Sequence, residues 1–198
     1  PRPGGVSAAG PWARFGGGFG PPRTWGMMRT HTMLQEDDMA ISVGDRVPDV
    51  TLRTMSAEGP AAVQSTDVLG SGKVVLFAVP GAFTPTCSDH HLPGFVLRAD
   101  DLAAKGVDTI ACVAVNDPFV MGAWGQAQGT DGKVLMLSDG NGQFAAAMGL
   151  EFDGSGFGLG TRSQRYAAII EDGVVTELMI EPGPGLEASS ADAVLAKL

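Results

Sequence analysis

Cys87 is the side chain of this sequence that is best placed to react. It lies between an apolar run at residues 73–79 and an amphipathic pattern at residues 84–105, which predict a buried strand followed by a helix. Threonine and proline residues beside Cys87 favour a helix start, so the cysteine falls in a first helical turn. Backbone amides and the helix dipole favour an anion there, and the thiolate is the nucleophilic form of cysteine. The spacing therefore predicts a reactive thiolate; an inert buried cysteine is the alternative.

Two histidines, His90 and His91, follow Cys87 by three and four residues. A Cys-x-x-His pair can begin a metal site, but such a site needs a second pair of ligands, and the sequence offers none. We therefore interpret both histidines as helix residues and predict no metal site.

The second cysteine, Cys112, lies inside an apolar run at residues 110–115. A buried core thiol is the simpler interpretation of this position. A disulfide with Cys87 would need the two Cα atoms within about 7 Å, so it would require local unfolding around Cys87. The sequence has no Cys-x-x-Cys motif, which argues against a thioredoxin-type disulfide reductase.

The segments around these residues predict an α/β protein. Apolar runs rich in β-branched residues predict buried strands, amphipathic patterns predict helices, and Asp172-Gly173 predicts a type I′ hairpin turn. Their order predicts a thioredoxin-like fold, with a central mixed sheet flanked by helices. The expected elements are strands at 47–54, 73–79, 107–115 and 134–137, helices at 84–105, 118–124 and 142–150, a hairpin at 166–180, and a last helix from Ser189 or Ser190 to Leu198.

The composition indicates a globular protein with a substantial core. The chain has 198 residues, of which 44% are hydrophobic and 18% charged. Its net charge of −9 argues against a nucleic-acid-binding protein, which needs a basic face. No apolar run approaches the roughly 18 residues of a membrane span. Two cysteines exclude a disulfide scaffold and fit a reducing compartment.

Charge is distributed unevenly along the chain. Residues 1–35 contain four arginines, no lysine and no acidic residue, and they are rich in glycine and proline. This composition is typical of an organellar transit segment, although an unrelated leader would look the same. We therefore predict a flexible leader or transit segment at residues 1–40 and a single domain at residues 41–198.

The segment around Cys87 resembles a known active site. The pattern Pro80-x-x-x-Thr84-x-x-Cys87 is similar to the signature of the peroxiredoxins, and the longer run at residues 79–95 resembles the plant type II and peroxiredoxin 5 group. The resemblance extends over residues 40–198, and its other blocks follow in family order. These blocks are residues 115–121, 138–140, 158–163 and 165–166.

The resemblance implies a thioredoxin fold and a peroxidase that needs no metal, haem or flavin. Cys87 is then the nucleophile that attacks a hydroperoxide, and Thr84, one helical turn earlier, has a hydroxyl within reach of sulfur and peroxide. Arg165 corresponds to the family's distant arginine, which suits both thiolate and peroxide because it is always charged. Pro80 shields the sulfur from water, and Arg162 is given a supporting role.

Attack on peroxide leaves a sulfenic acid that a second thiol must resolve. Animal peroxiredoxin 5 has a resolving cysteine near its C-terminus, but the matching residues 185–189 contain no thiol here. Cys112 corresponds to the second cysteine of the plant group, so it is either a resolving or a structural thiol. We favour external reduction by glutaredoxin with glutathione, or by thioredoxin. The family also implies a homodimer, with core or interface roles for Phe83, Phe95, Phe119, Trp124 and Phe157.

Two other functions fit the same residues. A peroxide sensor or thiol relay would pass its oxidation to a partner protein, and a thioredoxin-fold binding module would not react at all. Location is equally open. The arginine-bearing leader favours a mitochondrion or plastid, Ala196-Lys197-Leu198 resembles a peroxisomal signal, and a chain without its leader would be cytoplasmic.

Overall fold

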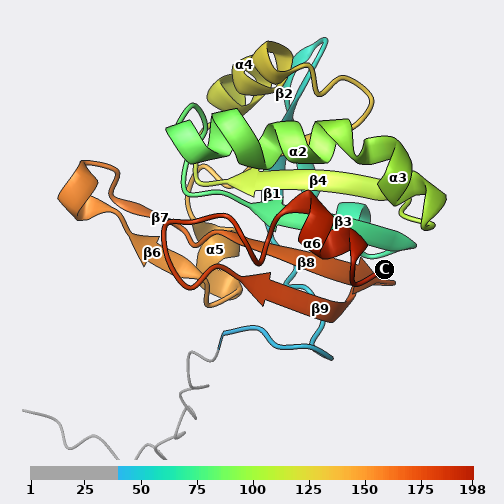
Figure 1. Cartoon of the computed structure of the whole chain (residues 1–198). Coiled ribbons are helices and arrows are strands. Elements are labelled where there is room, and N and C mark those ends of the chain that lie inside the picture. The colour runs from blue at the N-terminus through green and yellow to red at the C-terminus, as the bar shows by residue number, and fades with distance from the viewer. Residues whose placement is uncertain (1–39) are drawn as a thin grey trace, which may run out of the picture. The chain divides into compact units, whose positions relative to one another are not determined.

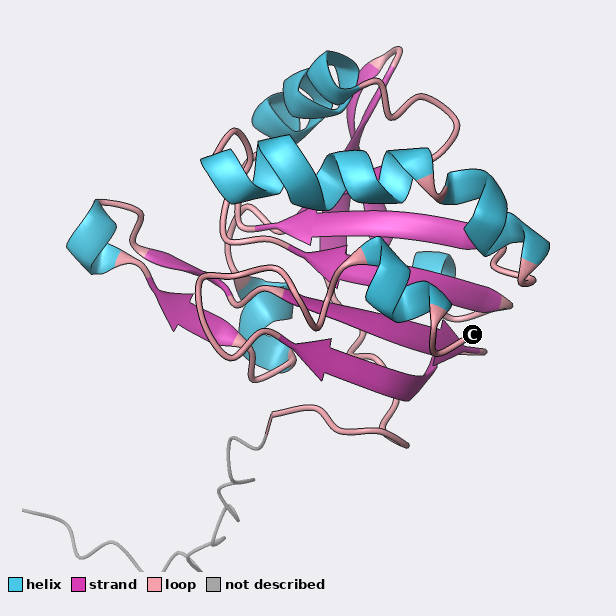
Figure 2. Cartoon of the chain, viewed as in Figure 1, coloured by secondary structure: helices cyan, strands magenta, loops and turns pink. Residues whose placement is uncertain are grey.

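The computed structural model describes residues 40–198, which form a seven-stranded mixed sheet covered by helices on both faces (Figures 1 and 2). The strand order is β2-β1-β5-β4-β3-β8-β9. The central strands β3, β4 and β5 are parallel, and the remaining pairs are antiparallel. These strands are β1 (Thr51–Ser56), β2 (Gly59–Gln64), β3 (Lys73–Ala78), β4 (Thr109–Ala114), β5 (Leu135–Ser138), β8 (Tyr166–Glu171) and β9 (Val174–Ile180).

The central strands are buried on both faces, which explains their continuous apolar sequences. One face of the sheet packs against α2, α3, α4 and α6, and the other packs against α1 and α5. The predicted thioredoxin-like α/β fold is therefore confirmed. The helices are α1 (Ser65–Leu69), α2 (Leu92–Leu97), α3 (Ala99–Ala104), α4 (Pro118–Gln128), α5 (Gln143–Ala147) and α6 (Ala191–Leu195).

Local sequence signals set several element ends as expected. Asp172 and Gly173 have φ of 49° and 81°, which are the positive values that a type I′ turn needs. The Asp117 carboxylate accepts the Val120 backbone N–H at 2.9 Å and caps α4. Ser190 caps α6 in the same way.

Other boundaries differ from the prediction. The first strand begins at Thr51 and pairs with β2, a partner that the sequence did not suggest. The last helix ends at Leu195, and the helical segment after β3 is divided into several pieces. A small second sheet, β6 (Glu151–Asp153) with β7 (Thr161–Ser163), was not predicted either.

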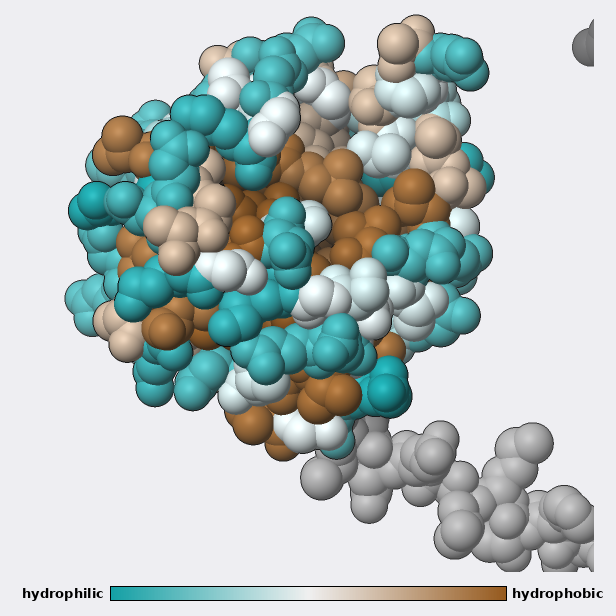
Figure 3. All heavy atoms as spheres, turned by 90° about the vertical axis from the view of Figure 1, so that its right-hand side faces the viewer, coloured by the Kyte–Doolittle hydropathy of each residue, from teal (hydrophilic) through white to brown (hydrophobic). Residues whose placement is uncertain are grey.

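The arrow of β4 points its carboxyl end toward the left of Figure 1, and β3 and β5 run parallel to it. At the opposite end, polar residues cover most of the surface, and apolar residues show in a band between them (Figure 3). No helix among residues 40–198 is long and apolar enough to cross a membrane. The predicted leader lies outside the described residues, except for Ala40.

Candidate active site

Cys87 follows β3 across a short loop and opens a π-helical turn, Cys87–His91, that continues into α2. Asn116, which follows β4, holds this loop, because its side-chain oxygen accepts the Ala82 backbone N–H at 2.9 Å. Phe83 in the loop has φ of 61°, an unusual value for a residue with a side chain. π-helical turns often occur at functional sites. The Cys87 side chain itself is fully buried.

Arg165 reaches the sulfur from a segment that is distant in the sequence. It directly precedes β8, whose first residue Tyr166 pairs with Ala78 at the end of β3. This register places Arg165 beside the chain that leaves β3. Its Nη2 donates to the Cys87 Sγ at 3.4 Å, and the side chain is buried. Two predicted site residues that are 78 positions apart are thus in contact.

His91 is a site residue that the sequence interpretation missed. Arg165 Nη1 lies 3.0 Å from His91 Nδ1, and His91 Nε2 lies 3.0 Å from the Ser189 carbonyl oxygen. A guanidinium only donates, so Nδ1 must accept and the imidazole proton must lie on Nε2. The four-residue spacing from Cys87 was the available signal, since it places both side chains on one side of a helix.

The environment of His91 keeps its imidazole neutral. The pKa of His91 is lowered from 6.5 to about 4, mainly because the ring is buried. The bond to the Ser189 carbonyl opposes this shift, the Arg165 charge adds to it, and the Glu181 charge opposes it slightly. The ring packs against Phe77 and Phe95, with centroid distances of 5.0 and 5.6 Å. The exposed neighbour His90 makes none of these contacts.

Thr84 lines the same cleft as Arg165, but its hydroxyl bonds to another residue. Its hydroxyl donates to the Gly81 carbonyl at 2.9 Å, and no hydrogen bond joins it to Cys87 within residues 40–198. Its oxygen therefore remains available as an acceptor. A Cβ at Gly81 would lie 3.3 Å from Thr84 Cγ2 and 3.4 Å from Arg162 Nη1, so the absence of a side chain permits this close packing.

Arg162 does not contact the sulfur. Its Nη1 donates to the Val115 carbonyl at 2.9 Å, and its Nε donates to the Leu159 carbonyl at 2.8 Å. It therefore ties the loop before β7 to the end of β4, behind the Cys87 loop.

A cleft of about 820 Å³ opens beside the sulfur. Pro80, Thr84 and Arg165 form its inner end, and Cys87 lies behind them. The rest of the lining is largely apolar, but it includes three carboxylate side chains. The outer lining consists of Pro85, Thr86, Glu151, Phe152, Asp153, Phe157, Gln164, Glu181, Pro182, Gly183 and Pro184.

Cys112 lies in the middle of β4, between Phe77 on β3 and Met136 on β5. It is fully buried in the same apolar cluster as Cys87, and both cysteines are free thiols. Burial, and to a lesser extent the proximity of Cys87, raises the pKa of the Cys112 thiol well above its usual range.

The predicted aromatic residues divide into two groups. Phe95 and Trp124 are buried, and the Trp124 indole N–H donates to the Ser88 hydroxyl at 3.0 Å. Phe83, Phe119 and Phe157 are exposed. Within residues 40–198, no group of three or more His, Cys, Asp or Glu side chains could hold a metal ion.

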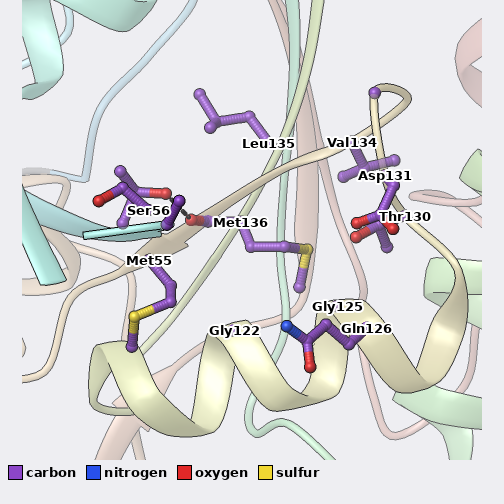
Figure 4. A pocket seen from close by; sticks show the side chains of 13 residues that line it. Met55, Ser56, Gly122, Gly125, Gln126, Thr130, Asp131, Val134, Leu135 and Met136 are labelled. Atoms are coloured by element: carbon purple, nitrogen blue, oxygen red, sulfur yellow. Dashed lines mark hydrogen bonds between the residues drawn. The ribbon is translucent and has the colours of Figure 1, made fainter. Parts of the chain in front are cut away.

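A second cavity, of about 320 Å³, lies between α4 and the strands β1 and β5 (Figure 4). Gly122 and Gly125 of α4 face Met55 and Met136 there, and a Cβ at either glycine would come within 3.0 Å of the methionine. These glycines allow α4 to pack closely on the sheet. None of the residues that line this cavity lines the cleft beside Cys87.

Comparisons with known proteins agree on one family. Residues 42–195 match the family model described as Redoxin. The chain is 52% identical over 163 residues to Peroxiredoxin-2E-2, chloroplastic, of Oryza sativa subsp. japonica, covering 80% of this chain and 72% of that protein. It is 46% identical over 159 residues to Peroxiredoxin-2B of Arabidopsis thaliana, covering 80% and 98%. Reduced Prx3 from Vibrio vulnificus, solved in complex with H2O2, has a TM-score of 0.76 and 52% identity, covering 79% of this chain and 98% of that chain.

Proposed function

Since the chain belongs to the redoxin family and, within it, to the type II peroxiredoxins, we propose that it reduces hydroperoxides at Cys87. It is a thiol-dependent peroxidase, with named peroxiredoxins among its relatives at 46–52% identity. The contact of 3.4 Å between Arg165 Nη2 and the Cys87 sulfur carries the assignment to this cysteine. A permanent positive charge at that distance can stabilise the negative charge that moves from sulfur to oxygen during the reaction.

The first step is a two-electron oxidation of the sulfur. The thiolate attacks the terminal oxygen of the hydroperoxide, an S–O bond forms, and the O–O bond breaks. The other oxygen leaves as an alkoxide, or as hydroxide from hydrogen peroxide, and takes up a proton. The products are the Cys87 sulfenic acid and an alcohol or water. Arg165 lies where it can stabilise the negative charge on the leaving oxygen.

Thr84 and Pro80 shape the place where peroxide binds. Because the Thr84 hydroxyl donates to Gly81, its oxygen is free to accept the O–H of the peroxide. Pro80 lines the cleft and presents no N–H, so its apolar ring would shield the sulfur from water. Cys87 is fully buried, so we expect peroxide to approach it from the cleft that these side chains line.

The apolar cleft supports hydrogen peroxide and small alkyl hydroperoxides as substrates. Phe152, Phe157 and the three prolines of the outer lining offer contact to an organic group, which would lie outward from the sulfur. Arg165 and Thr84 would hold the polar peroxide end.

External reduction of the sulfenic acid fits the positions of the thiols. Cys112 is buried in mid-strand, and residues 185–189, beside Glu181, contain no thiol. Two external thiol groups therefore return Cys87 to the thiol and release one disulfide and one water. Glutathione with glutaredoxin, or thioredoxin, would supply them.

A homodimer and an organellar location complete the proposal. Exposed Phe83 and Phe119 lie near the Cys87 loop and α4 and would be covered in a dimer. A relative named as chloroplastic, together with four arginines and no acidic residue in residues 1–35, favours a plastid.

Steady-state turnover tests the activity. The purified chain should consume cumene hydroperoxide continuously when glutathione and glutaredoxin, or thioredoxin and its reductase, are supplied, and the Cys87→Ser variant should not. A single oxidation followed by a stable mixed disulfide with a partner protein would instead identify a sensor. Mass spectrometry of the peroxide-treated chain would distinguish a sulfenic acid, a glutathione adduct and a Cys87–Cys112 disulfide.

A further inference from the structure

We propose that residues 181–189 position the Arg165 guanidinium through His91, and that Glu181 and His91 are positioning residues of the peroxidatic site. This inference rests on the function proposed for Cys87. It concerns neither the nucleophile nor the substrate, but the segment that holds the arginine against the sulfur.

The first link is between Arg165 and His91. The guanidinium makes two side-chain contacts, from Nη2 to the Cys87 sulfur and from Nη1 to His91, and its buried Nε has no partner within residues 40–198. Because few contacts hold this group, loss of the His91 contact would leave the guanidinium free to turn about the remaining one.

The second link fixes the imidazole. Nδ1 can accept from Arg165 only if the proton lies on Nε2, and the Ser189 carbonyl oxygen accepts that proton at 3.0 Å. The carbonyl therefore selects the tautomer that Arg165 needs. A hydrogen-bond partner on the far nitrogen is a common way of orienting a functional histidine.

The third link holds Ser189. One oxygen of the Glu181 carboxylate accepts the Ser189 backbone N–H at 2.7 Å, the Ser189 hydroxyl at 2.8 Å and the Glu187 backbone N–H at 2.9 Å. Ser189 is fully buried and Glu181 is 8% exposed, so little water competes for these bonds. The carboxylate thus folds the segment back on itself and presents the Ser189 carbonyl to His91.

The fourth link closes a ring. The Glu181 backbone N–H donates to the Arg165 carbonyl oxygen at 3.0 Å, where the chain leaves β9 beside the start of β8. Arg165, His91, Ser189 and Glu181 are therefore joined in a closed circuit of buried hydrogen bonds. Pro182 and Pro184 of the same segment line the cleft, so a molecule that displaces them would also disturb Arg165.

Substitution of His91 tests the ring directly. His91→Phe keeps an aromatic ring between Phe77 and Phe95 but removes the acceptor, and His91→Asn retains an acceptor and a donor. Stopped-flow measurement of the second-order rate constant with hydrogen peroxide should show a loss of about 10- to 100-fold for His91→Phe. His91→Asn should recover part of this loss, whereas the control His90→Gln should match the wild type.

A double-mutant cycle separates positioning from a general structural role. In an Arg165→Met background the guanidinium is absent, so His91→Phe should change the residual rate constant by less than about twofold. If His91→Phe lowers the rate constant equally in both backgrounds, or has no effect in the wild-type background, the inference is wrong.

Asp139 is a matched control for Glu181, because it is also a buried carboxylate that accepts backbone N–H groups. Its donors are Phe144 and Ala145, on the other side of the sheet. Glu181→Gln should lower the peroxide rate constant about three- to tenfold and leave the reduction of the oxidised enzyme unchanged. Asp139→Asn should lower stability without lowering this rate constant. Equal peroxide rate constants for Glu181→Gln and Asp139→Asn would show that Glu181 does not position Arg165. Failure of the proposed function would differ, because Cys87→Ser would then keep its activity.

Discussion

Cys87 and Cys112 are two buried thiols in one apolar cluster, and they differ in what surrounds them. Arg165 donates to the sulfur of Cys87, which lies beyond the end of β3. Cys112 lies inside β4, with a strand paired on each side, and burial raises the pKa of its thiol well above the usual range. We therefore expect the cation in contact with the sulfur, and not burial alone, to distinguish Cys87 as the reactive thiol.

The position along the strand explains this difference. A residue in the middle of a central strand is enclosed by the neighbouring strands and by the helices above them. Beyond the strand end, the chain turns into a loop and a helix, so Arg165, directly before β8, can contact Cys87. The C-terminal segment contacts His91 in the same helical segment. In open α/β sheets, functional sites gather at the carboxyl ends of strands for the same reason.

Substitution of Cys87 by serine gives the largest expected effect, and the same substitution at Cys112 is the comparison. Cys87→Ser should lower peroxide consumption by at least about 1,000-fold, because an alcohol is a far weaker nucleophile than a thiolate. Cys112→Ser should retain the first turnover, measured as one equivalent of peroxide consumed per chain without reductant. Equal first turnovers for the two variants would remove the distinction between these thiols.

Removal of the cation from Cys87 should have the next largest effect. Arg165→Met leaves the sulfur buried without its donor, so the second-order rate constant with hydrogen peroxide should fall about 100- to 1,000-fold. Arg53→Met, on β1, is the control and should leave the rate constant unchanged. A loss below about twofold for Arg165→Met would mean that the cation does not distinguish Cys87 from Cys112.

The elements around both cysteines could be predicted because their sequences are unambiguous. The central strands are apolar on both faces, and the helix at Asp117 and the turn at Asp172 carry specific local signals. The edge strand β2 and the short pair β6 and β7 were missed. They are largely exposed, so their sequences lack an apolar pattern.

The site was less predictable than the fold. Resemblance indicated Cys87 and Arg165, which the structure brings into contact. His91, Ser189 and Glu181 were not assigned to the site, because their roles depend on hydrogen bonds between distant segments. His91 and Ser189 are 98 positions apart, and no local pattern indicates that a main-chain carbonyl will face an imidazole.

A buried histidine beside Cys87 predicts a pH effect on stability that the surroundings of Cys112 would not produce. The folded-state pKa of His91 is lowered from 6.5 to about 4, so between these values the unfolded chain binds a proton that the folded chain does not. Stability should therefore fall as pH falls from 7 to 5, by about 2 kcal/mol from this group. Urea unfolding of the wild type and of His91→Phe measures it: the wild type should lose about 2 kcal/mol more than the variant over this range. An equal loss in both would contradict the assignment.

The last difference between the two thiols is the cleft, which leads toward Cys87. Its charged side chains predict the smallest effect, a dependence of the rate on the charge of the hydroperoxide. Glu151 and Asp153 are exposed carboxylates in its lining, and Arg165 at its inner end already contacts the sulfur and His91. An anionic hydroperoxide should therefore react more slowly than a neutral one of similar size, such as cumene hydroperoxide compared with its ring-carboxylated derivative. Glu151→Gln combined with Asp153→Asn should raise kcat/KM for the anion about three- to tenfold at low salt, with little change for the neutral substrate. The gain should shrink at high salt, because added ions screen exposed charges.

The control for this prediction is a pair of exposed carboxylates outside the cleft lining, Asp100 and Asp131. The double variant Asp100→Asn with Asp131→Asn should not raise kcat/KM for the anion. An equal gain from that pair would show that only the net charge of the protein matters.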